Sequence, residues 1–338
     1  MVIVMRKDAD AASIEKVVSE VKSRGFMPHV SEGESRTLIG AIGPAPTEEL
    51  REHFAGLAGV ETVVRITKPF KLASREFRHD DSFVMIGGVK TGNGRFVVAA
   101  GPCGVESREQ TLEAADIVKR AGAQVLRGGA YKPRTSPYAF QGLGEQGLEI
   151  LAEARAATGL PIVTEVTTPE LVEKVASVAD MLQVGARNTQ NFALLAEVGR
   201  SGKPVLFKRG MSTSVSEFLQ AAEYILSQGN PQVVLCERGI RTFETSTRFT
   251  LDVSAVPVLK ELSHLPVWVD PSHAAGRRSL VASLALAGAA AGADGIIVEV
   301  HPRPEEAKSD AAQQLDEAEF AGLMARLEPV VRALGKTF

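Results

Sequence analysis

The sequence has 338 residues, of which 44% are hydrophobic and 23% are charged, and its formal net charge is −3. This length exceeds one average domain and suits a barrel of roughly 250 residues with a small additional domain. The slightly negative charge argues against general binding to nucleic acids or membrane surfaces, so any anion site has to be a local positive patch.

The first residues carry charge where a secretory signal needs an apolar stretch, and no segment reaches the roughly 18 apolar residues of a membrane span. We therefore expect a cytoplasmic protein. Cys103 and Cys236 are the only cysteines, too few to staple a chain of this size, so we expect both to be reduced thiols.

Residues 1–67 have their own pattern of elements. The pattern predicts a strand over 2–7, a helix over 12–25, a hairpin over 28–43 that turns at Glu32-Gly33, a helix over 47–57 and a strand over 60–67. The order βαββαβ predicts a ferredoxin-like domain. The polar stretch 68–82, which contains Pro69, is predicted as the linker to the rest of the chain.

Residues 83–338 alternate between strand and helix patterns. A hairpin over 83–98, turned by Gly92-Asn93-Gly94, is expected to close the bottom of a barrel. Eight apolar runs then end in polar or charged residues, at 95–103, 125–136, 161–166, 181–188, 204–210, 233–241, 266–273 and 295–301. Helical patterns lie at 108–122, 144–159, 168–178, 189–202, 214–229, 254–264, 279–293 and 315–334. This alternation predicts a (β/α)8 barrel, with a doubly wound open sheet as the alternative.

Side chains that can bind a metal follow three of these runs. Cys103 follows the first run, His273 ends the seventh, Glu299 lies in the eighth, and Asp310 is in the loop after it. Strands one, seven and eight are adjacent in a closed barrel, so these groups can meet at one ion of the Mn, Fe, Co or Zn class. Alternatively, Cys103 is a small buried apolar residue, His273 is a hydrogen-bonded loop residue, and the two acids are salt-bridge partners.

Positively charged side chains gather after runs two, four, five and six. They are Arg127, Lys132, Arg134, Arg187, Lys208, Arg209, Arg238 and Arg241. At one barrel mouth these charges would repel each other, which fits a polyanionic ligand, for instance one with two phosphates and a carboxylate. The alternative is a solvated rim that acids such as Glu165 and Glu237 compensate. Without the glycine motifs of dinucleotide-binding or P-loop proteins, a nucleotide enzyme is disfavoured.

Seven motifs span the barrel region: GPCGVES (101–107), LRGGAYKPRTSPYAFQGLG (126–144), GARN (185–188), KRG (208–210), CERGIR (236–241), DPSH (270–273) and VEVHPRPEEAKSD (298–310). With them the sequence resembles the 3-deoxy-D-arabino-heptulosonate 7-phosphate (DAHP) synthases that carry an N-terminal ferredoxin-like regulatory domain. The resemblance implies a metal-dependent condensation of phosphoenolpyruvate with D-erythrose 4-phosphate, the first step of the shikimate pathway to aromatic amino acids. It also implies a homotetramer.

The resemblance implies roles for individual residues. The implied ligands of one divalent metal ion are Cys103, His273, Glu299 and Asp310. The implied phosphoenolpyruvate site contains Arg127, Lys132, Arg187, Lys208, Arg238 and the backbone at Ala186. Arg134 and Thr135 would bind the phosphate of erythrose 4-phosphate, whose hydroxyl groups would lie near Asp310 and the Pro133 carbonyl.

Lys132 is the candidate to move a proton at the aldehyde-derived oxygen. Burial among arginines is expected to lower its pKa, and a purely electrostatic clamp is its alternative role. In the N-terminal domain, His29 and Ser31 fall where the resembling proteins bind an aromatic amino acid. This predicts feedback inhibition by tyrosine or phenylalanine, whereas the alternative is a domain that only aids assembly, with both residues ordinary on an exposed strand.

Three other functions fit parts of this sequence. The nearest is 3-deoxy-D-manno-octulosonate 8-phosphate synthase, a family that typically has Asn after Lys-Ala where this chain has Lys132-Pro133-Arg134, so the present sequence favours the shorter sugar. A non-catalytic sensor of aromatic amino acids would explain residues 1–67 but not the ligands of the barrel. A metal-dependent aldolase of general sugar metabolism needs a Schiff-base lysine, which Lys208 could imitate, or a histidine-rich zinc site.

Two positions depart from the pattern of the DAHP synthases that the sequence resembles. Gly104 stands where that family usually has Ser, and Ala274-Ala275 stands where related chains often have Ser-Gly.

Overall fold

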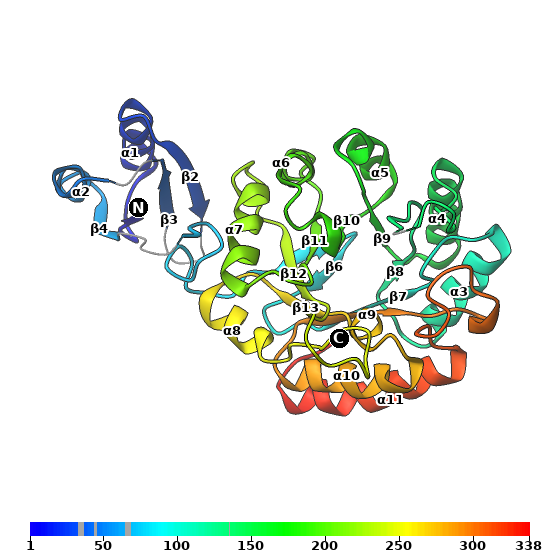
Figure 1. Cartoon of the computed structure of the whole chain (residues 1–338). Coiled ribbons are helices and arrows are strands. Elements are labelled where there is room, and N and C mark those ends of the chain that lie inside the picture. Colours follow the sequence, from blue (N-terminus) through cyan, green and yellow to red (C-terminus); the bar gives the residue numbers. More distant parts are fainter. Residues whose placement is uncertain (33–36, 44–45, 65–68, 135) are drawn as a thin grey trace. The chain divides into compact units, whose positions relative to one another are not determined.

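The chain divides into two structural units, Met1–Asp80 and Asp81–Phe338. The computed structural model describes residues 1–32, 37–43, 46–64, 69–134 and 136–338 (Figure 1). Among the described helices, none is both long and apolar enough to cross a membrane.

The first unit is a four-stranded antiparallel sheet with two helices. Its elements are β1 (Val2–Met5), α1 (Ala11–Ser23), β2 (Met27–Glu32), β3 (Thr37–Ile42), α2 (Glu48–Ala55) and β4 (Val60–Val64). The strand order β2-β3-β1-β4 confirms the ferredoxin-like prediction. Asp10 and Thr47 begin the helices by accepting hydrogen bonds from backbone N–H groups of the first turn. The Gly33 of the predicted hairpin turn lies outside the described residues.

The stretch predicted as a linker contains buried aromatic side chains. Phe70, Leu72 and Phe77 are each less than 5% exposed, and the first unit extends to Asp80. Phe77 packs on the sheet at Gly40, where an added Cβ would lie 2.9 Å from the Phe77 ring. Apolar residues spaced through this polar segment are thus buried, and one of them packs on the sheet of the first unit, where the sequence predicts only a polar linker.

The second unit is a closed barrel of eight parallel strands. They are β7 (Val97–Gly101), β8 (Val125–Arg127), β9 (Ile162–Glu165), β10 (Met181–Val184), β11 (Val205–Lys208), β12 (Val233–Glu237), β13 (Val267–Val269) and β14 (Gly295–Glu299). The strands neighbour one another in chain order, and β14 pairs with β7 to close the barrel. Every strand residue is buried, so continuous apolar runs on both faces confirm the predicted (β/α)8 fold.

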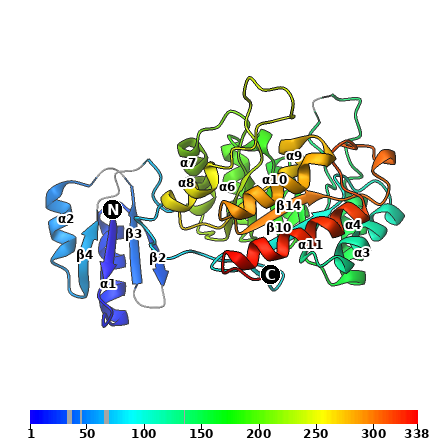
Figure 2. The same cartoon turned by 90° about the horizontal axis from the view of Figure 1, so that it is seen from below.

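Helices surround these strands (Figure 1). The α-helices are α3 (Arg108–Arg120), α4 (Glu145–Thr158), α5 (Val172–Val178), α6 (Phe192–Arg200), α7 (Val215–Leu226), α8 (Ala255–Leu262), α9 (Pro271–Ala275), α10 (Arg278–Ala290) and α11 (Glu317–Ala333). Short 3-10 helices occur at η1 (Pro169–Leu171), η2 (Ala186–Asn188) and η3 (Pro304–Glu306). The last helix, α11, packs beside α10 and α3 and so joins the end of the barrel to its beginning (Figure 2).

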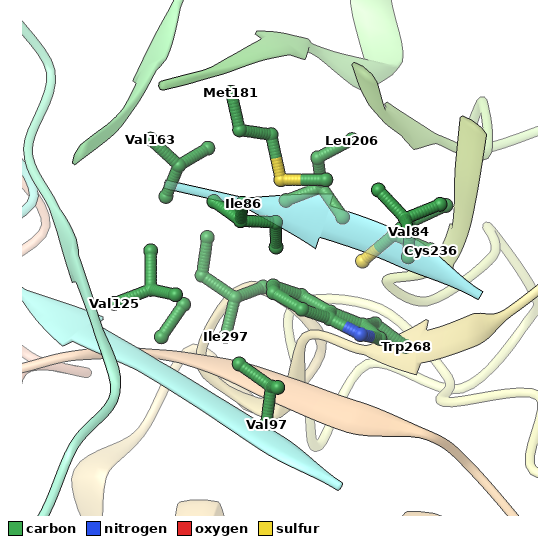
Figure 3. Close-up of a cluster of buried hydrophobic side chains, with 12 residues drawn as sticks. Val84, Ile86, Val97, Val125, Val163, Met181, Leu206, Cys236, Trp268 and Ile297 are labelled. Atoms are coloured by element: carbon green, nitrogen blue, oxygen red, sulfur yellow. The ribbon is translucent and has the colours of Figure 1, made fainter. Parts of the chain in front are cut away.

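A hairpin fills the end of the barrel where the strands begin. It consists of β5 (Val84–Ile86) and β6 (Val89–Thr91), and Val84 and Ile86 are fully buried among inward-facing barrel side chains, including Trp268 (Figure 3). The turn predicted at Gly92-Asn93-Gly94 is wrong, because the hairpin turns at Gly87-Gly88, with positive φ at both residues. Gly92-Asn93-Gly94 forms a second tight turn, which leads into β7. Residues of both turns have positive φ, a conformation that glycine adopts without strain.

Candidate active site

The carboxyl ends of the barrel strands surround a cavity of about 250 Å³. The predicted site residues in its wall are Arg127, Lys132, Arg134, Ala186, Arg187, Lys208, Arg238, His273 and Asp310. Cys103 and Glu299 are buried next to this wall and contact Lys132 and Arg127. Thr135 lies outside the described residues. Because parallel strands all end at this face, residues far apart in the sequence meet here.

Cys103, Glu299 and Asp310 form a tight cluster of potential metal ligands. One ligand atom of each lies within 4.8 Å of the other two, and Cys103 Sγ is 3.4 Å from Asp310 Oδ2. Asp310 has a φ of 50°, in the left-handed region that few residues other than glycine adopt. A parallel bridge between Val300 and Leu315 closes the loop that holds this residue in place.

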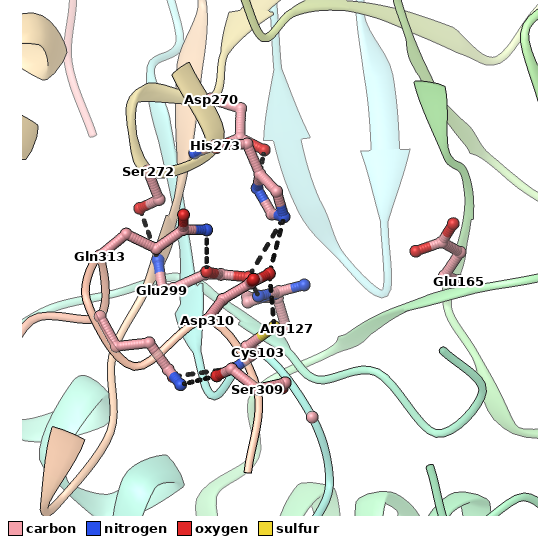
Figure 4. Close-up of polar contacts among 12 residues, drawn as sticks. Cys103, Arg127, Glu165, Asp270, Ser272, His273, Glu299, Ser309, Asp310 and Gln313 are labelled. Atoms are coloured by element: carbon pink, nitrogen blue, oxygen red, sulfur yellow. Dashed lines mark hydrogen bonds and ion pairs between the residues drawn. The ribbon is translucent and has the colours of Figure 1, made fainter. Parts of the chain in front are cut away.

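His273, on α9, points toward two residues of this cluster (Figure 4). Its Nε2 lies 3.5 Å from Glu299 Oε1 and 3.9 Å from Asp310 Oδ2. Asp270 begins α9 by accepting the His273 backbone N–H at 3.0 Å, and its other oxygen lies 2.7 Å from His273 Nδ1. A carboxylate on one ring nitrogen orients the other nitrogen toward an ion, the arrangement common at metal-binding histidines.

Glu299 is fully buried but keeps its negative charge. Its Oε1 accepts a hydrogen bond from Arg127 at 2.7 Å, and its Oε2 accepts one from Gln313 at 2.6 Å. Burial by itself would raise the pKa of Glu299, but His273, Arg127 and Lys132 outweigh it and hold that pKa well below the ordinary value. Glu299 is therefore a carboxylate, the form that binds a cation.

Lys132 lies against the cluster, and its pKa differs from the expected one. Its Nζ is 2.9 Å from both Cys103 Sγ and the Cys103 carbonyl oxygen. Burial lowers its pKa, as predicted, but Cys103 and Glu299 outweigh burial and raise the pKa above the ordinary lysine value. The prediction of a lowered pKa is wrong because Lys132 lies near Cys103 and the Glu299 carboxylate and not near arginines alone.

Some of the predicted cations line the cavity, whereas Arg209 and Arg241 do not. Lys208 donates to Asp270 at 2.5 Å at the cavity wall. Arg209 points elsewhere and donates to Glu237 at 2.9 Å and to Asp252 at 2.8 Å, so two carboxylates neutralise it. Arg241 is exposed and does not line the cavity. Arg209 and Arg241 therefore do not belong to the anion site that the sequence predicts.

Two arginines of the wall have buried N–H groups without hydrogen-bond partners in the described part of the chain. These groups are Nε of Arg127 and Nη1 of Arg238. Buried donors in folded proteins are nearly always paired, so unpaired ones in a cavity wall fit an anionic ligand. Arg134 and Arg187 also line the cavity, and Arg187 is exposed, with its Nη1 3.5 Å from the Pro133 carbonyl.

Several wall residues were not predicted from the sequence. Glu165, which the sequence suggests only as a compensating acid of the rim, lines the cavity together with Gln183, Met211, Arg248 and Phe249. Figure 4 shows Glu165 across the barrel mouth from Glu299. Gln183 was recognisable as a polar residue inside an apolar strand, whereas Arg248 and Phe249 come from the long loop after β12, whose path the sequence does not predict.

In the first unit, His29 and Ser31 alternate along β2 and so share one face of this strand. The His29 ring lies 5.6 Å from the Phe77 ring, and burial lowers the pKa of His29. The strand β2 is at the edge of the sheet, paired with β3. Both residues are half-buried, and His29 lies beside an aromatic ring.

Comparisons with known proteins agree along the whole chain. The DAHP synthetase I family matches residues 39–332, and the DAHP synthase ferredoxin-like domain matches residues 1–68. A phospho-2-dehydro-3-deoxyheptonate aldolase from Thermotoga maritima is 51% identical over 335 residues, which cover 99% of each chain. A 2-dehydro-3-deoxyphosphooctonate aldolase from Bradyrhizobium diazoefficiens is 35% identical over 72% of this chain and 93% of its own.

Solved structures give the same result. The crystal structure of the Thermotoga maritima aldolase, described as a DAHP synthase, covers 99% of this chain and 98% of its own, with a TM-score of 0.79 and 50% identity. A truncated form of 3-deoxy-D-arabino-heptulosonate 7-phosphate synthase from the same organism covers 80% of this chain and 99% of its own, with a TM-score of 0.75. On these matches in sequence, domain order and fold, the chain belongs to the DAHP synthetase I family of enzymes.

Proposed function

We propose that this enzyme condenses phosphoenolpyruvate with D-erythrose 4-phosphate to give DAHP and phosphate, the first step of the shikimate pathway. The observation that carries this proposal is one cavity that combines a cluster of metal-binding side chains with unpaired arginine N–H groups. Such a cavity suits two phosphorylated substrates, one of which has a carbonyl group to be polarised. The name of the Thermotoga maritima relative supports the same reaction.

Cys103, His273, Glu299 and Asp310 would hold one divalent ion of the Mn, Fe, Co or Zn class. The sulfur and carboxylate donors of Cys103, Glu299 and Asp310 lie within 4.8 Å of one another, and the His273 imidazole on α9 lies 3.5 Å from Glu299 and 3.9 Å from Asp310. This mixture of donors fits such an ion. When bound, the ion would polarise the aldehyde oxygen of erythrose 4-phosphate. Burial and Glu299 raise the pKa of Cys103 to about 12, so thiolate ligation requires loss of a proton and acid should weaken metal binding.

The cations of the wall would orient the two substrates. Arg127, Lys208 and Arg238, with Lys132, Arg187 and the backbone of Ala186, would bind phosphoenolpyruvate, while Arg134 would bind the phosphate of the aldehyde. Thr135, which lies outside the described residues, remains a second candidate for that phosphate. This arrangement would bring C3 of phosphoenolpyruvate to the aldehyde carbon, where the new carbon–carbon bond forms. A water molecule adds its oxygen at C2, and the bond between C2 and the phosphate oxygen breaks to release phosphate. Fixing both phosphates lowers the entropic cost of this encounter.

Lys132 would give a proton to the oxygen that derives from the aldehyde. Its Nζ lies 2.9 Å from Cys103 Sγ, and therefore beside the ligands that would hold the ion. The position suits a proton donor at that oxygen. The water that adds at C2 and the phosphate that leaves would lie near Glu165 and Lys208, which also line the cavity.

Arabinose 5-phosphate is the second candidate for the aldehyde, because the Bradyrhizobium relative is a 2-dehydro-3-deoxyphosphooctonate aldolase. Pro133, Arg134 and Ser136 line the cavity, and this Lys-Pro-Arg-Thr-Ser segment favours erythrose 4-phosphate. A phosphate-release assay with phosphoenolpyruvate and each aldehyde, with and without chelator, tests the choice. We expect turnover with erythrose 4-phosphate that a chelator abolishes and added metal restores. Turnover with arabinose 5-phosphate alone would overturn the assignment.

The metal site is tested by Cys103→Ala. This change removes a buried ligand, so we expect loss of at least about a hundredfold in turnover and a lower metal content after dialysis. Metal content is measured by elemental analysis of the purified full chain. Cys236→Ala is the matched control, because Cys236 is equally buried in the barrel core and lies outside the ligand cluster. Full turnover and a full metal content in Cys103→Ala would contradict the proposed site.

The N-terminal unit would provide regulation. We propose that His29 and Ser31 contribute to a site for tyrosine or phenylalanine and that the enzyme assembles as a homotetramer. Their shared face on an edge strand, next to Phe77, supports contact with an aromatic ligand. Light scattering on the purified chain measures the assembly state, with and without the amino acid.

A further inference from the structure

Arg238 is a buried arginine that lies against an aromatic ring. It directly follows β12, is 6% exposed, and its Cζ lies 4.2 Å from the centroid of the Phe249 ring. This distance is well inside the range of cation–π contacts. Its Nη1 has no hydrogen-bond partner in the described part of the chain.

The carboxylates near Arg238 are bonded to other groups. Asp270 accepts from Lys208 and lies 2.7 Å from the His273 ring, and Glu237 accepts from Arg209 at 2.9 Å. Burial lowers the pKa of Arg238 in spite of the attraction of Asp270. The charge of Arg238 is therefore less neutralised than that of Arg209, which has two carboxylate partners and lies outside the cavity wall.

The backbone fixes the Phe249 ring in this place. An antiparallel bridge between Ile240 and Thr250 closes the loop, and the Phe249 N–H donates to the Ala274 carbonyl at 3.0 Å. Gly239 has a φ of 95°, and an added Cβ there would lie 2.7 Å from the Phe249 Cβ. The absence of a side chain at residue 239 thus leaves room for Phe249 beside Arg238.

We propose that Phe249 is a positioning residue that holds the Arg238 guanidinium by its face and leaves its N–H groups free to bind the phosphate of phosphoenolpyruvate. An aromatic face attracts the cation without accepting the in-plane N–H donors that a carboxylate would occupy. Arg238 thereby keeps both its orientation and its hydrogen-bonding capacity. This inference rests on the proposed function for the identity of the substrate.

The first test compares Phe249→Leu with Phe249→Tyr. Leucine keeps an apolar side chain but removes the aromatic face, so the KM for phosphoenolpyruvate should rise about two- to thirtyfold with little change in kcat. Tyrosine keeps the face and should restore the KM to within about twofold of the wild type. Phe243→Leu is the control in the same loop, because Phe243 is 97% exposed. An unchanged KM in Phe249→Leu, or no rescue by tyrosine, would overturn the inference.

The second test asks whether Phe249 acts through Arg238. In an Arg238→Gln background, Phe249→Leu should cause no further rise in KM, because the cation is already absent. Independent, multiplicative effects of the two substitutions would contradict this route of action. Calorimetric titration with inorganic phosphate, without turnover, should show weaker binding to Phe249→Leu than to the wild type. This titration still decides the inference if the wild type fails to convert phosphoenolpyruvate, a result that would refute only the proposed function.

Discussion

Glu165 is a carboxylate in the wall of a cavity that consists largely of cations. Gln183 donates a hydrogen bond to its Oε2 at 3.0 Å, and Gly185 leaves the space that its other oxygen occupies. A Cβ on residue 185 would lie 2.0 Å from Glu165 Oε1. At the residue scale, the position of this charge therefore depends on the absence of one methyl group.

Gly185→Ala should displace the Glu165 carboxylate without unfolding the protein. Gly185 has a φ of −70°, which alanine adopts freely, and the clash is with the end of a flexible side chain. We expect kcat/KM for phosphoenolpyruvate to fall about ten- to a hundredfold, while the midpoint of thermal unfolding hardly changes. Glu165→Gln should show a comparable loss of activity. Wild-type kinetics in Gly185→Ala would mean that the position of Glu165 does not matter.

Among the elements, α11 connects the loop that contains Asp310 to the closure of the barrel. The helix follows the loop that contains Asp310, and it packs beside α10 and α3 (Figure 2). Its start is defined by a capping box, in which Asp316 accepts the Glu319 N–H at 2.8 Å and the Glu319 side chain accepts the Asp316 N–H at 3.0 Å. Capping of this kind fixes where the loop ends and the helix begins.

Asp316→Ala should destabilise the barrel by about 1 kcal/mol, because alanine cannot accept the exposed N–H groups of the first turn. The measurement is the thermal unfolding midpoint, which should fall by about 2 °C. Asp316→Asn keeps a side-chain oxygen and should stay near the wild type. If asparagine destabilised as much as alanine, capping would not explain the effect.

The whole molecule joins a ferredoxin-like unit to a barrel that contains the candidate active site. Each unit has its own apolar core, with Phe54 and Ile39 in the first and Trp268 and Ile86 in the second. Separate cores fit the proposal that the first unit binds an effector independently of the residues proposed for catalysis. We therefore expect substitutions in the first unit to change inhibition by the amino acid and not the turnover without inhibitor.

His29→Ala should raise the tyrosine or phenylalanine concentration needed for half-inhibition by about tenfold or more, while uninhibited turnover stays unchanged. The steady-state assay with each amino acid measures both quantities. His53→Gln is the control, since His53 lies on α2 of the same unit. Inhibition equal to that of the wild type in His29→Ala would exclude this residue from the effector site.

The local pattern of the sequence was sufficient for much of the fold. Continuous apolar runs such as Val205–Phe207 and Val233–Leu235 become strands buried on both faces, because both faces of a parallel barrel strand are covered. The hairpin turn was misplaced, because Gly87-Gly88 and Gly92-Asn93-Gly94 both tolerate a positive φ. Local conformational preference cannot choose between two such segments, whereas the burial of Val84 and Ile86 in the barrel can.

For the site, the order of residues along the chain was enough to show which chemical groups follow the barrel strands. It identified Cys103, His273, Glu299 and Asp310 as possible ligands, since each follows or ends a strand of a predicted barrel. Tertiary structure alone decided the ion pairs: Arg209 turns to two carboxylates, Lys132 gains anionic neighbours, and Arg238 lies on an aromatic ring. Electrostatic partnership depends on distances between distant segments, and those distances exist only after the barrel has closed.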